Sequence, residues 1–271
     1  MTAKIWTADR DVITVRGPEA ESYLHSQVSQ NVDDMSGGES RLSFLLEPKG
    51  NIEGYFRITK DVQGEFFLDT DPGFGSSLLS SLERFKLRTK ADFQLHEWKM
   101  VSVIGEWAPV DLGPEVLLIT SPWLSETAID VLGRTVQIDL PNFAPEEYER
   151  VRLECGLPTI GRELHVGGIP NESGVVERAV SFNKGCYRGQ ELVERISARG
   201  GGRQKIRRIR SDAELSSGQE LFFDSERVGE VLSVTNSAPY VGFASLRGED
   251  SEVATVDDQK VLVTSLESVL P

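Results

Sequence analysis

The stretch Lys-Gly-Cys-Tyr-Arg-Gly-Gln-Glu, residues 184–191, is the most unusual part of this sequence. Gly185 and Gly189 flank a Cys-Tyr pair, and glycine permits sharp bends and close approach of a ligand or another segment. Gln190 then begins a predicted helix. Cationic neighbours and a helix N-terminus both favour the thiolate form of cysteine. Cys186 is therefore either a reactive, ligand-contacting thiol or a small buried residue beside a structural turn.

Upstream of this stretch, helical and extended patterns alternate. Ala20, Tyr23 and Leu24 share one face of a predicted helix over residues 19–30, because they recur at spacings of three and four. Similar patterns predict further helices over residues 78–87, 125–132 and 145–155. Strands are predicted within the first 20 residues and over residues 41–47, 52–58, 65–69, 93–104, 115–120 and 136–138. This mixture is typical of an α/β body.

Downstream, short β-rich runs separated by turn residues recur over residues 205–210, 220–223, 228–235, 241–245 and 260–264. That pattern predicts a small β-barrel. The glycine triplet at 200–202 marks the boundary. We therefore expect an α/β body over residues 1–202, with two lobes formed by 1–90 plus 140–202 and by 91–139, and a barrel over residues 203–271.

Composition limits the function classes. The 271 residues include 43 acidic and 29 basic side chains, a formal net charge of −14. Such a protein repels nucleic acid and anionic membranes on average. No signal peptide or spanning segment is expected, and two cysteines fit a reducing compartment, so we predict a cytoplasmic protein. The three histidines show no metal-ligand spacing, and no bound metal is predicted.

The octapeptide resembles the Lys-Gly-Cys-Tyr-x-Gly-Gln-Glu signature of the YgfZ family. These are folate-binding proteins related to the glycine-cleavage T-protein, an aminomethyltransferase. Three other stretches resemble family motifs: residues 15–27, the Leu-Leu-Glu-Pro-Lys-Gly-Asn-Ile hairpin at 45–52, and Arg-Leu-Glu-Cys-Gly-Leu-Pro at 152–158. The resemblance covers almost the whole chain. It marks as motif positions Lys184, Gly185, Cys186, Tyr187, Gly189, Gln190 and Glu191.

The resemblance implies an α+β fold: a T-protein-like folate-binding body whose lobes surround a central hole, followed by a C-terminal β-barrel. It implies tetrahydrofolate as ligand and a role in building or repairing iron–sulfur clusters in client enzymes, with Cys186 as the functional residue. A folate-dependent aminomethyltransferase or other one-carbon transferase is the alternative. The T-protein carries a Gly-Tyr-Thr-Gly-Glu stretch that helps seat the pterin, and the matching region of this chain, about 113–126, lacks it.

Folate chemistry suggests which side chains would bind. A pterin needs an aromatic wall and a carboxylate or amide at its edge. Its glutamate tail needs an arginine fork, for which Arg152 is the first choice. A surface salt bridge from Arg152 to Glu149 or another helix neighbour is the alternative role. The candidates for the pterin are Tyr187, Trp123, Glu172 and Gln190.

Three further features leave alternatives open. The run 199–210 has six basic and no acidic residues, and either holds anions or an acidic partner or forms the exposed face of the first barrel strand. In a pure docking protein without folate, Arg207 and Arg208 would be the exposed contact residues. The glycine-rich run 161–174 either lines a ligand pocket or crosses the surface. Cys155 is expected to pack in the core.

Overall fold

The computed structural model describes residues 2–108, 112–113, 116–121, 128–200, 204–248 and 252–266. It divides the chain into two compact units. Unit 1 comprises Met1–Phe143 and Arg178–Gln190, and unit 2 comprises Ala144–Glu177 and Glu191–Pro271. Within the described residues, none of the helices has the length and apolar character needed to cross a membrane.

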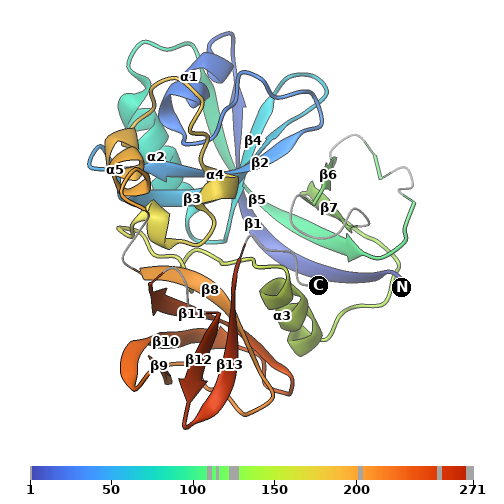
Figure 1. Cartoon of the computed structure of the whole chain (residues 1–271). Helices are drawn as coiled ribbons and strands as arrows, with labels where there is room; N and C mark the ends of the chain where they lie inside the picture. The colour runs from blue at the N-terminus through green and yellow to red at the C-terminus, as the bar shows by residue number, and fades with distance from the viewer. Residues whose placement is uncertain are drawn as a thin grey trace. The chain divides into compact units, whose positions relative to one another are not determined.

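Unit 1 is built on one seven-stranded antiparallel sheet (Figure 1). The strand order is β2-β3-β4-β1-β5-β7-β6. The strands are β1 (Lys4–Arg16), β2 (Ser40–Leu46), β3 (Ile52–Lys60), β4 (Phe66–Thr70), β5 (Asp92–Ile104), β6 (Val116–Thr120) and β7 (Ala128–Gly133), and the helices are α1 (Ala20–Gln27) and α2 (Gly75–Lys86).

The two faces of this sheet carry different residues because side chains alternate along a strand. On one face, Ile13, Ile58 and Leu68 are fully buried with Leu24 of α1 and Leu82 of α2. The opposite face carries a smaller apolar cluster from the central strands and a group of buried charges described below. The two helices thus cover one face only.

The longest ladder in the sheet joins β1 to β5. It runs without interruption from Lys4 opposite Ile104 to Arg16 opposite Asp92. The residue pair Ile13 and Val15 lies in the helix-covered core, while Ile5 packs with Val101 in a separate cluster near the other end of the ladder. The same two strands therefore contribute residues to both of these apolar clusters.

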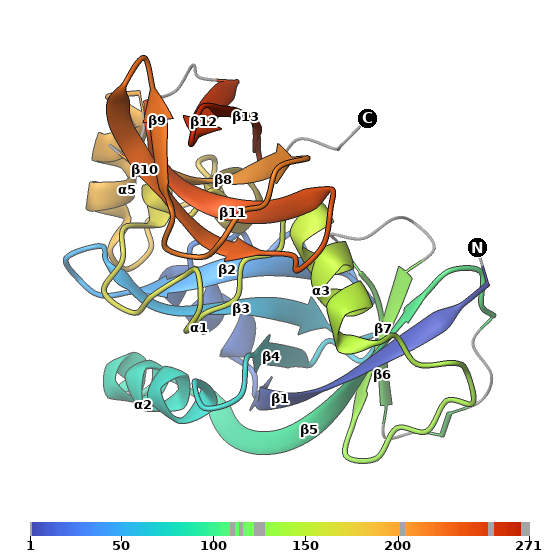
Figure 2. The same cartoon turned by 90° about the horizontal axis from the view of Figure 1, so that it is seen from below.

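Unit 2 holds a closed six-stranded barrel (Figure 2). Its strand order is β10-β11-β8-β13-β12-β9, and pairing of β9 with β10 closes the ring. The strands are β8 (Gln204–Ser211), β9 (Glu220–Phe223), β10 (Glu226–Val234), β11 (Tyr240–Arg247), β12 (Val253–Val256) and β13 (Gln259–Ser265). The barrel interior is apolar, with Ile209, Leu221 and Val261 fully buried.

Four helical segments lie outside the sheets: α3 (Pro145–Glu154), the 3-10 turn η1 (Pro170–Glu172), α4 (Val176–Ala179) and α5 (Gln190–Ser197). Helix α3 begins at a proline, and the Glu147 side chain accepts a hydrogen bond from the Ala144 N–H at 3.1 Å. Both features favour a helix start. Gly156, in the left-handed region, ends it.

The predicted fold class is confirmed, since a mixed α/β part precedes a C-terminal barrel. Two predicted elements are wrong. The described part of the predicted helix over 125–132 is strand β7, which is buried on both faces, so apolar residues fall in succession and imitate a helical pattern. Residues 136–138 form no strand. Strand β12 was not predicted. The proposed boundary at 202/203 stays a prediction.

Candidate functional site

The octapeptide 184–191 lies mostly in unit 1, where Lys184 ties it to the end of α1. The Lys184 ammonium donates hydrogen bonds to the carbonyl oxygens of His25, Val28 and Gln30 at 2.6, 2.8 and 2.8 Å. These carbonyls lie at and just beyond the helix C-terminus, where backbone acceptors lack helical partners. Burial lowers the pKa of Lys184 to about 8, against the opposing charge of Asp33.

Gly189 anchors the other end of the motif to the turn between β2 and β3. Its φ is +80°, and a Cβ there would lie 2.4 Å from the carbonyl oxygen of Glu47 and 3.2 Å from the Cα of Gly50. Such distances exclude any side chain without movement of the backbone. The structure therefore brings together two stretches that the resemblance marked separately, the octapeptide and the 45–52 hairpin.

Arg188 makes the third attachment, to β3 and α2. Its Nη2 donates to Glu53 at 2.7 Å and to the Ser81 hydroxyl at 3.0 Å, and its guanidinium lies 4.4 Å from the centre of the Phe85 ring. The Arg188 backbone N–H also donates to the Ser26 carbonyl at 3.1 Å. The motif is thus fixed to a helix end, a turn and a second helix.

Between these attachments, Cys186 is exposed and its thiol is free. Tyr187 beside it is buried, and the Lys184 ammonium lies 5.2 Å from the centre of its ring. Gln190 begins α5, and its side-chain oxygen accepts a hydrogen bond from the Tyr187 N–H at 2.8 Å. Glu191 projects to solvent. The arrangement presents one open thiol on a rigidly supported segment.

His25 is a site residue that the sequence did not identify. A Cβ on Gly185 would lie 3.8 Å from its Nε2, so the imidazole stands beside the residue preceding Cys186. Burial and the Lys184 charge lower the pKa of His25, although Asp33, 3.5 Å from Nδ1, opposes them. A neutral imidazole can accept a proton. In the sequence, His25 lies within the predicted helix over 19–30 and within the family-like stretch 15–27, but neither feature assigns it a role.

Arg152 lies in unit 2, fully engaged with protein acceptors. Its five N–H groups donate to Glu149, Glu163 and the Leu157 carbonyl at 2.6–3.1 Å. Ser233 also donates to Glu163, at 2.5 Å, which links the network to barrel strand β10. The predicted alternative, a salt bridge with Glu149, is present, but it is buried. The role of Arg152 toward folate stays a prediction.

The remaining predicted residues are dispersed. Glu172 is half-buried in η1 of unit 2, within the run 161–174, and Trp123 lies outside the described residues. Cys155 is half-buried at the end of α3 rather than in the core.

Arg208 is only 2% exposed and donates to the carbonyls of Ser265 and Leu266, so its predicted exposure is wrong. Arg208 precedes Ile209, which lies in the barrel core, so Arg208 points to the outer face of β8 and is buried there against residues 265 and 266.

A group of buried charges on the face of the unit 1 sheet opposite α1 and α2 was also not predicted from the sequence. Arg57 donates to Asp69 at 2.8 Å and to Asp130 at 2.5 Å, and Asp130 accepts from the Ser102 hydroxyl at 2.6 Å. Arg10 completes the group through Asp69 at 3.0 Å. Asp130 lies in β7, the strand that was predicted as a helix, so its neighbours could not be identified.

The fold is that of the T-protein aminomethyltransferases. The chain superposes on the glycine cleavage system aminomethyltransferase T of Bartonella henselae with a TM-score of 0.75, covering 97% of this chain and 85% of that one at 16% identity. At that identity the likeness concerns the fold alone. No model of a protein family matches the chain.

Sequence relatives carry the names YgfZ and IBA57, and they confirm the resemblance inferred from the motifs. A Klebsiella pneumoniae relative named tRNA-modifying protein YgfZ is 22% identical, over 76% of this chain and 69% of its own length. A Pyricularia oryzae relative named mitochondrial iron-sulfur cluster assembly factor IBA57 homolog is 30% identical over 73% of this chain, which spans about half (54%) of that protein. A Haemophilus influenzae protein described as uncharacterized is 29% identical over 83% of this chain and 81% of its own length.

Proposed function

We propose that this protein binds tetrahydrofolate and supports the assembly or repair of iron–sulfur clusters in client enzymes, with the Cys186 thiol as the group that acts. One observation carries the proposal. Cys186 is exposed and free on a segment whose neighbours are fixed by Lys184 and Gly189. Such support holds a reactive group in place without covering it.

The chemistry of the thiol suits that role. A thiolate is a soft ligand that binds iron and other soft metals, and it is the usual ligand of iron–sulfur clusters. One cysteine cannot hold a cluster permanently, so the contact with a client or an assembly protein would be transient. We assign to His25 the task of accepting the thiol proton, because its imidazole stands beside Gly185 and burial lowers its pKa.

The described residues fit tetrahydrofolate in part. Gln190 suits the edge of a pterin through its side-chain amide N–H groups, since its oxygen already accepts from the Tyr187 N–H. Tyr187 is buried and offers little ring surface. Arg152 would have to exchange a carboxylate partner to bind a folate carboxylate, because all five of its N–H groups donate within the protein. The folate proposal therefore rests on Gln190 of the octapeptide and on the family resemblance.

Two measurements test the proposal on the same set of proteins. Calorimetric titration of the reduced protein with tetrahydrofolate measures binding, and restoration of iron–sulfur enzyme activity in a strain lacking the endogenous homologue measures function. We expect Cys186→Ala to bind folate normally and fail to restore activity. Cys155→Ala, which removes the other cysteine, should behave like the unchanged protein.

The outcomes separate the two parts of the proposal. Absence of saturable binding at millimolar tetrahydrofolate would overturn the folate assignment while leaving the thiol assignment intact. Full restoration by Cys186→Ala would overturn the thiol assignment. Weakened binding in Gln190→Ala, with an unchanged melting temperature, would support the pterin contact. No change in that variant would move the ligand away from the motif.

A second candidate is a folate-dependent one-carbon transferase, which the aminomethyltransferase fold favours. However, the sequence of this chain departs from that of the T-protein in the region about 113–126, which would seat the pterin. The discriminating assay offers an aminomethylated lipoyl carrier protein and tetrahydrofolate. Formation of methylenetetrahydrofolate and ammonia would support the transferase, whereas no turnover by a protein that binds folate would leave the accessory role.

Direct binding of nucleic acid or membrane is not part of the proposal. The net charge of −14 opposes both, and Arg208 of the basic run is buried. A gel-shift measurement with bulk tRNA at physiological salt tests this directly. We keep the cytoplasm as the expected compartment.

A further inference from the structure

A cavity in unit 1 lies on the face of the sheet opposite α1 and α2, well away from the cysteine motif. Its volume is about 770 Å³, within the range of small-molecule sites. Thr59, at the end of β3, lines it, whereas Gly189 contacts the turn before the start of β3. Since a strand rises about 3.3 Å per residue, the two ends of β3 lie on the order of 25 Å apart. The cavity is therefore a separate site.

One wall of this cavity is aromatic. The rings of Phe67 and Trp98 lie 5.9 Å apart between centres, and those of His96 and Trp98 lie 5.6 Å apart. Leu117 of β6 lines the cavity as well and packs with Phe67 and Trp98 in one apolar cluster. Phe67 is buried, so the half-buried rings of His96 and Trp98, both on β5, form the surface that a planar aromatic molecule can cover.

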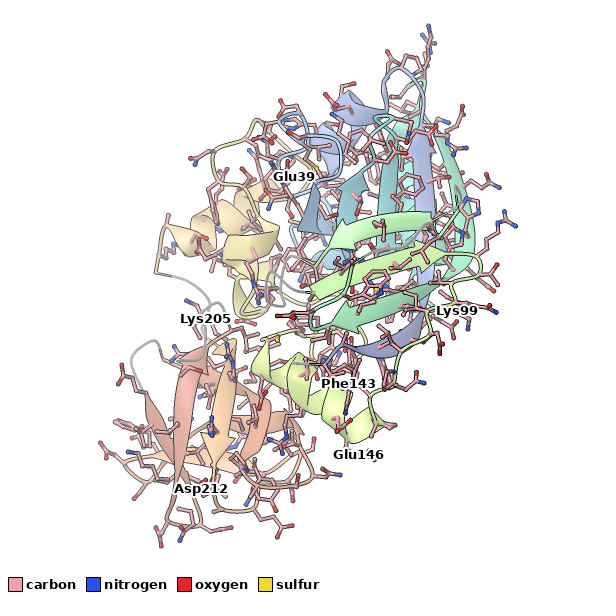
Figure 3. The ribbon with its side chains drawn as sticks, turned by 90° about the vertical axis from the view of Figure 1, so that its right-hand side faces the viewer. Glu39, Lys99, Phe143, Glu146, Lys205 and Asp212 are labelled. Atoms are coloured by element: carbon pink, nitrogen blue, oxygen red, sulfur yellow. The ribbon has the colours of Figure 1, made fainter. Side chains whose placement is uncertain are left out.

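The indole N–H of Trp98 is buried, and no described residue accepts a hydrogen bond from it. Buried polar atoms in native proteins are nearly always paired. This unpaired donor belongs to a cavity-lining residue, so a ligand oxygen can supply the missing acceptor. The next residue, Lys99, is half-exposed and extends away from the sheet, which leaves Trp98 on the cavity face (Figure 3).

The cavity also carries a spare positive charge. Arg134 lines it and makes no ion pair or hydrogen bond within the described part of the chain. The other arginine, Arg16, pairs with Glu65 at 2.8 Å, and the Asp61 carboxylate accepts backbone N–H groups of its own turn. Burial, Arg134 and Arg16 lower the pKa of His96, in keeping with a positive potential there. Among the lining residues that the structure describes, only Arg134 is available for an anion.

We propose that this cavity binds a planar aromatic carboxylate. The ring system would lie against Trp98 and His96, and the carboxylate would pair with Arg134. The Trp98 N–H would supply a further hydrogen bond to a ligand oxygen. One available arginine suits a monoanion and does not suit a polyphosphate, which would need several cations at once.

The test uses 2-naphthoate as the probe, with the whole chain and calorimetric titration. We expect saturable binding of one molecule per chain. Arg134→Gln should weaken binding at least tenfold, while Lys99→Gln, which removes the same charge from the neighbouring outer face, should change it less than twofold. The uncharged analogue 2-naphthylmethanol should bind at least tenfold more weakly. Melting temperatures of both variants show whether they remain folded.

Three results would overturn the proposal. The first is absence of 2-naphthoate binding at millimolar concentration. The second is equal affinity in Arg134→Gln and Lys99→Gln, which would remove the assigned charge contact. The third is displacement of 2-naphthoate by saturating tetrahydrofolate, which would make the two sites one. Unchanged naphthoate affinity in the presence of tetrahydrofolate supports separate sites, and failure of tetrahydrofolate to bind at all leaves this result untouched.

Discussion

Gly189 and Glu47 are so close that a Cβ on the glycine would lie 2.4 Å from the glutamate carbonyl oxygen. The contact joins two segments far apart in sequence, and it places the octapeptide against the β2–β3 turn. A glycine that is required for both its positive φ and a close approach gives a sharp mutational test.

We expect Gly189→Ala to destabilise unit 1 by about 2–4 kcal/mol, because the new methyl group must displace the backbone and the residue must keep a left-handed conformation. Thermal unfolding followed by circular dichroism measures the change. Gly185→Ala is the matched control, since its Cβ would meet only His25, at 3.8 Å. Equal melting temperatures of the two variants would contradict the close contact.

Lys184→Met should leave three backbone carbonyls at the end of α1 without their ammonium donor. We expect a loss of about 2–3 kcal/mol in the free energy of unfolding, since hydrogen bonds to charged groups contribute more than neutral ones. Urea titration gives the value. Lys49→Met, on an exposed lysine of the β2–β3 turn, should change stability by less than about 0.5 kcal/mol. A similar effect from both variants would show that Lys184 does not anchor the segment.

Asp130→Ala should be strongly destabilising, because it leaves Arg57 buried with one carboxylate fewer. Removing one member of a buried ion pair costs about 3–5 kcal/mol. Asp130 is fully buried, whereas Asp139 is exposed, so Asp139→Ala is the control for loss of an acidic residue. Chemical denaturation of the two variants provides the comparison. If Asp130→Ala unfolds at the same denaturant concentration as the control, the buried charges do not stabilise the sheet.

Arg152→Lys tests the network of unit 2. A lysine offers three donors from a single nitrogen and cannot reproduce the five N–H contacts of Arg152. We expect a loss of about 2–4 kcal/mol, as for a broken buried pair. Arg162→Lys, on a half-exposed partner of Glu149, should cost well under 1 kcal/mol. Calorimetric unfolding of both variants decides whether Arg152 holds unit 2 together.

The same network predicts a response to acid. Burial alone would raise the pKa of Glu149, but hydrogen bonds and charges from Arg152 and Arg162 outweigh it and lower the pKa to about 2. Because the folded-state pKa lies below the unfolded value of 4.5, the stabilisation is present above pH 4.5 and is lost between pH 4.5 and 2. With solvent screening, we expect a loss of about 2 kcal/mol. Glu149→Gln should remove this part of the pH dependence, and an unchanged slope would contradict the assignment.

The sequence was sufficient for those parts of the molecule in which neighbours along the chain determine the pattern. Helices α1, α2 and α3 and most strands follow from apolar spacing, and the octapeptide pointed to the T-protein fold. Strand β7 was predicted as a helix because burial on both faces removes the alternation of apolar and polar residues that marks a strand. Contacts such as Lys184 with Val28, or Arg57 with Asp130, depend on tertiary pairing, and no local pattern encodes them. The octapeptide could be identified in advance, whereas its anchors and His25 could not.

The ladder between β1 and β5 bears on how the chain is made. Lys4 pairs with Ile104, so the first strand synthesised is paired along its full length only after about a hundred further residues have been added. At roughly 5–20 residues per second, that delay lasts on the order of 5–20 seconds. Throughout it, a thirteen-residue β1 carries unpaired backbone groups and apolar side chains. Nascent chains stalled before residue 92 should therefore recruit more chaperone than chains in which residue 104 has left the ribosome.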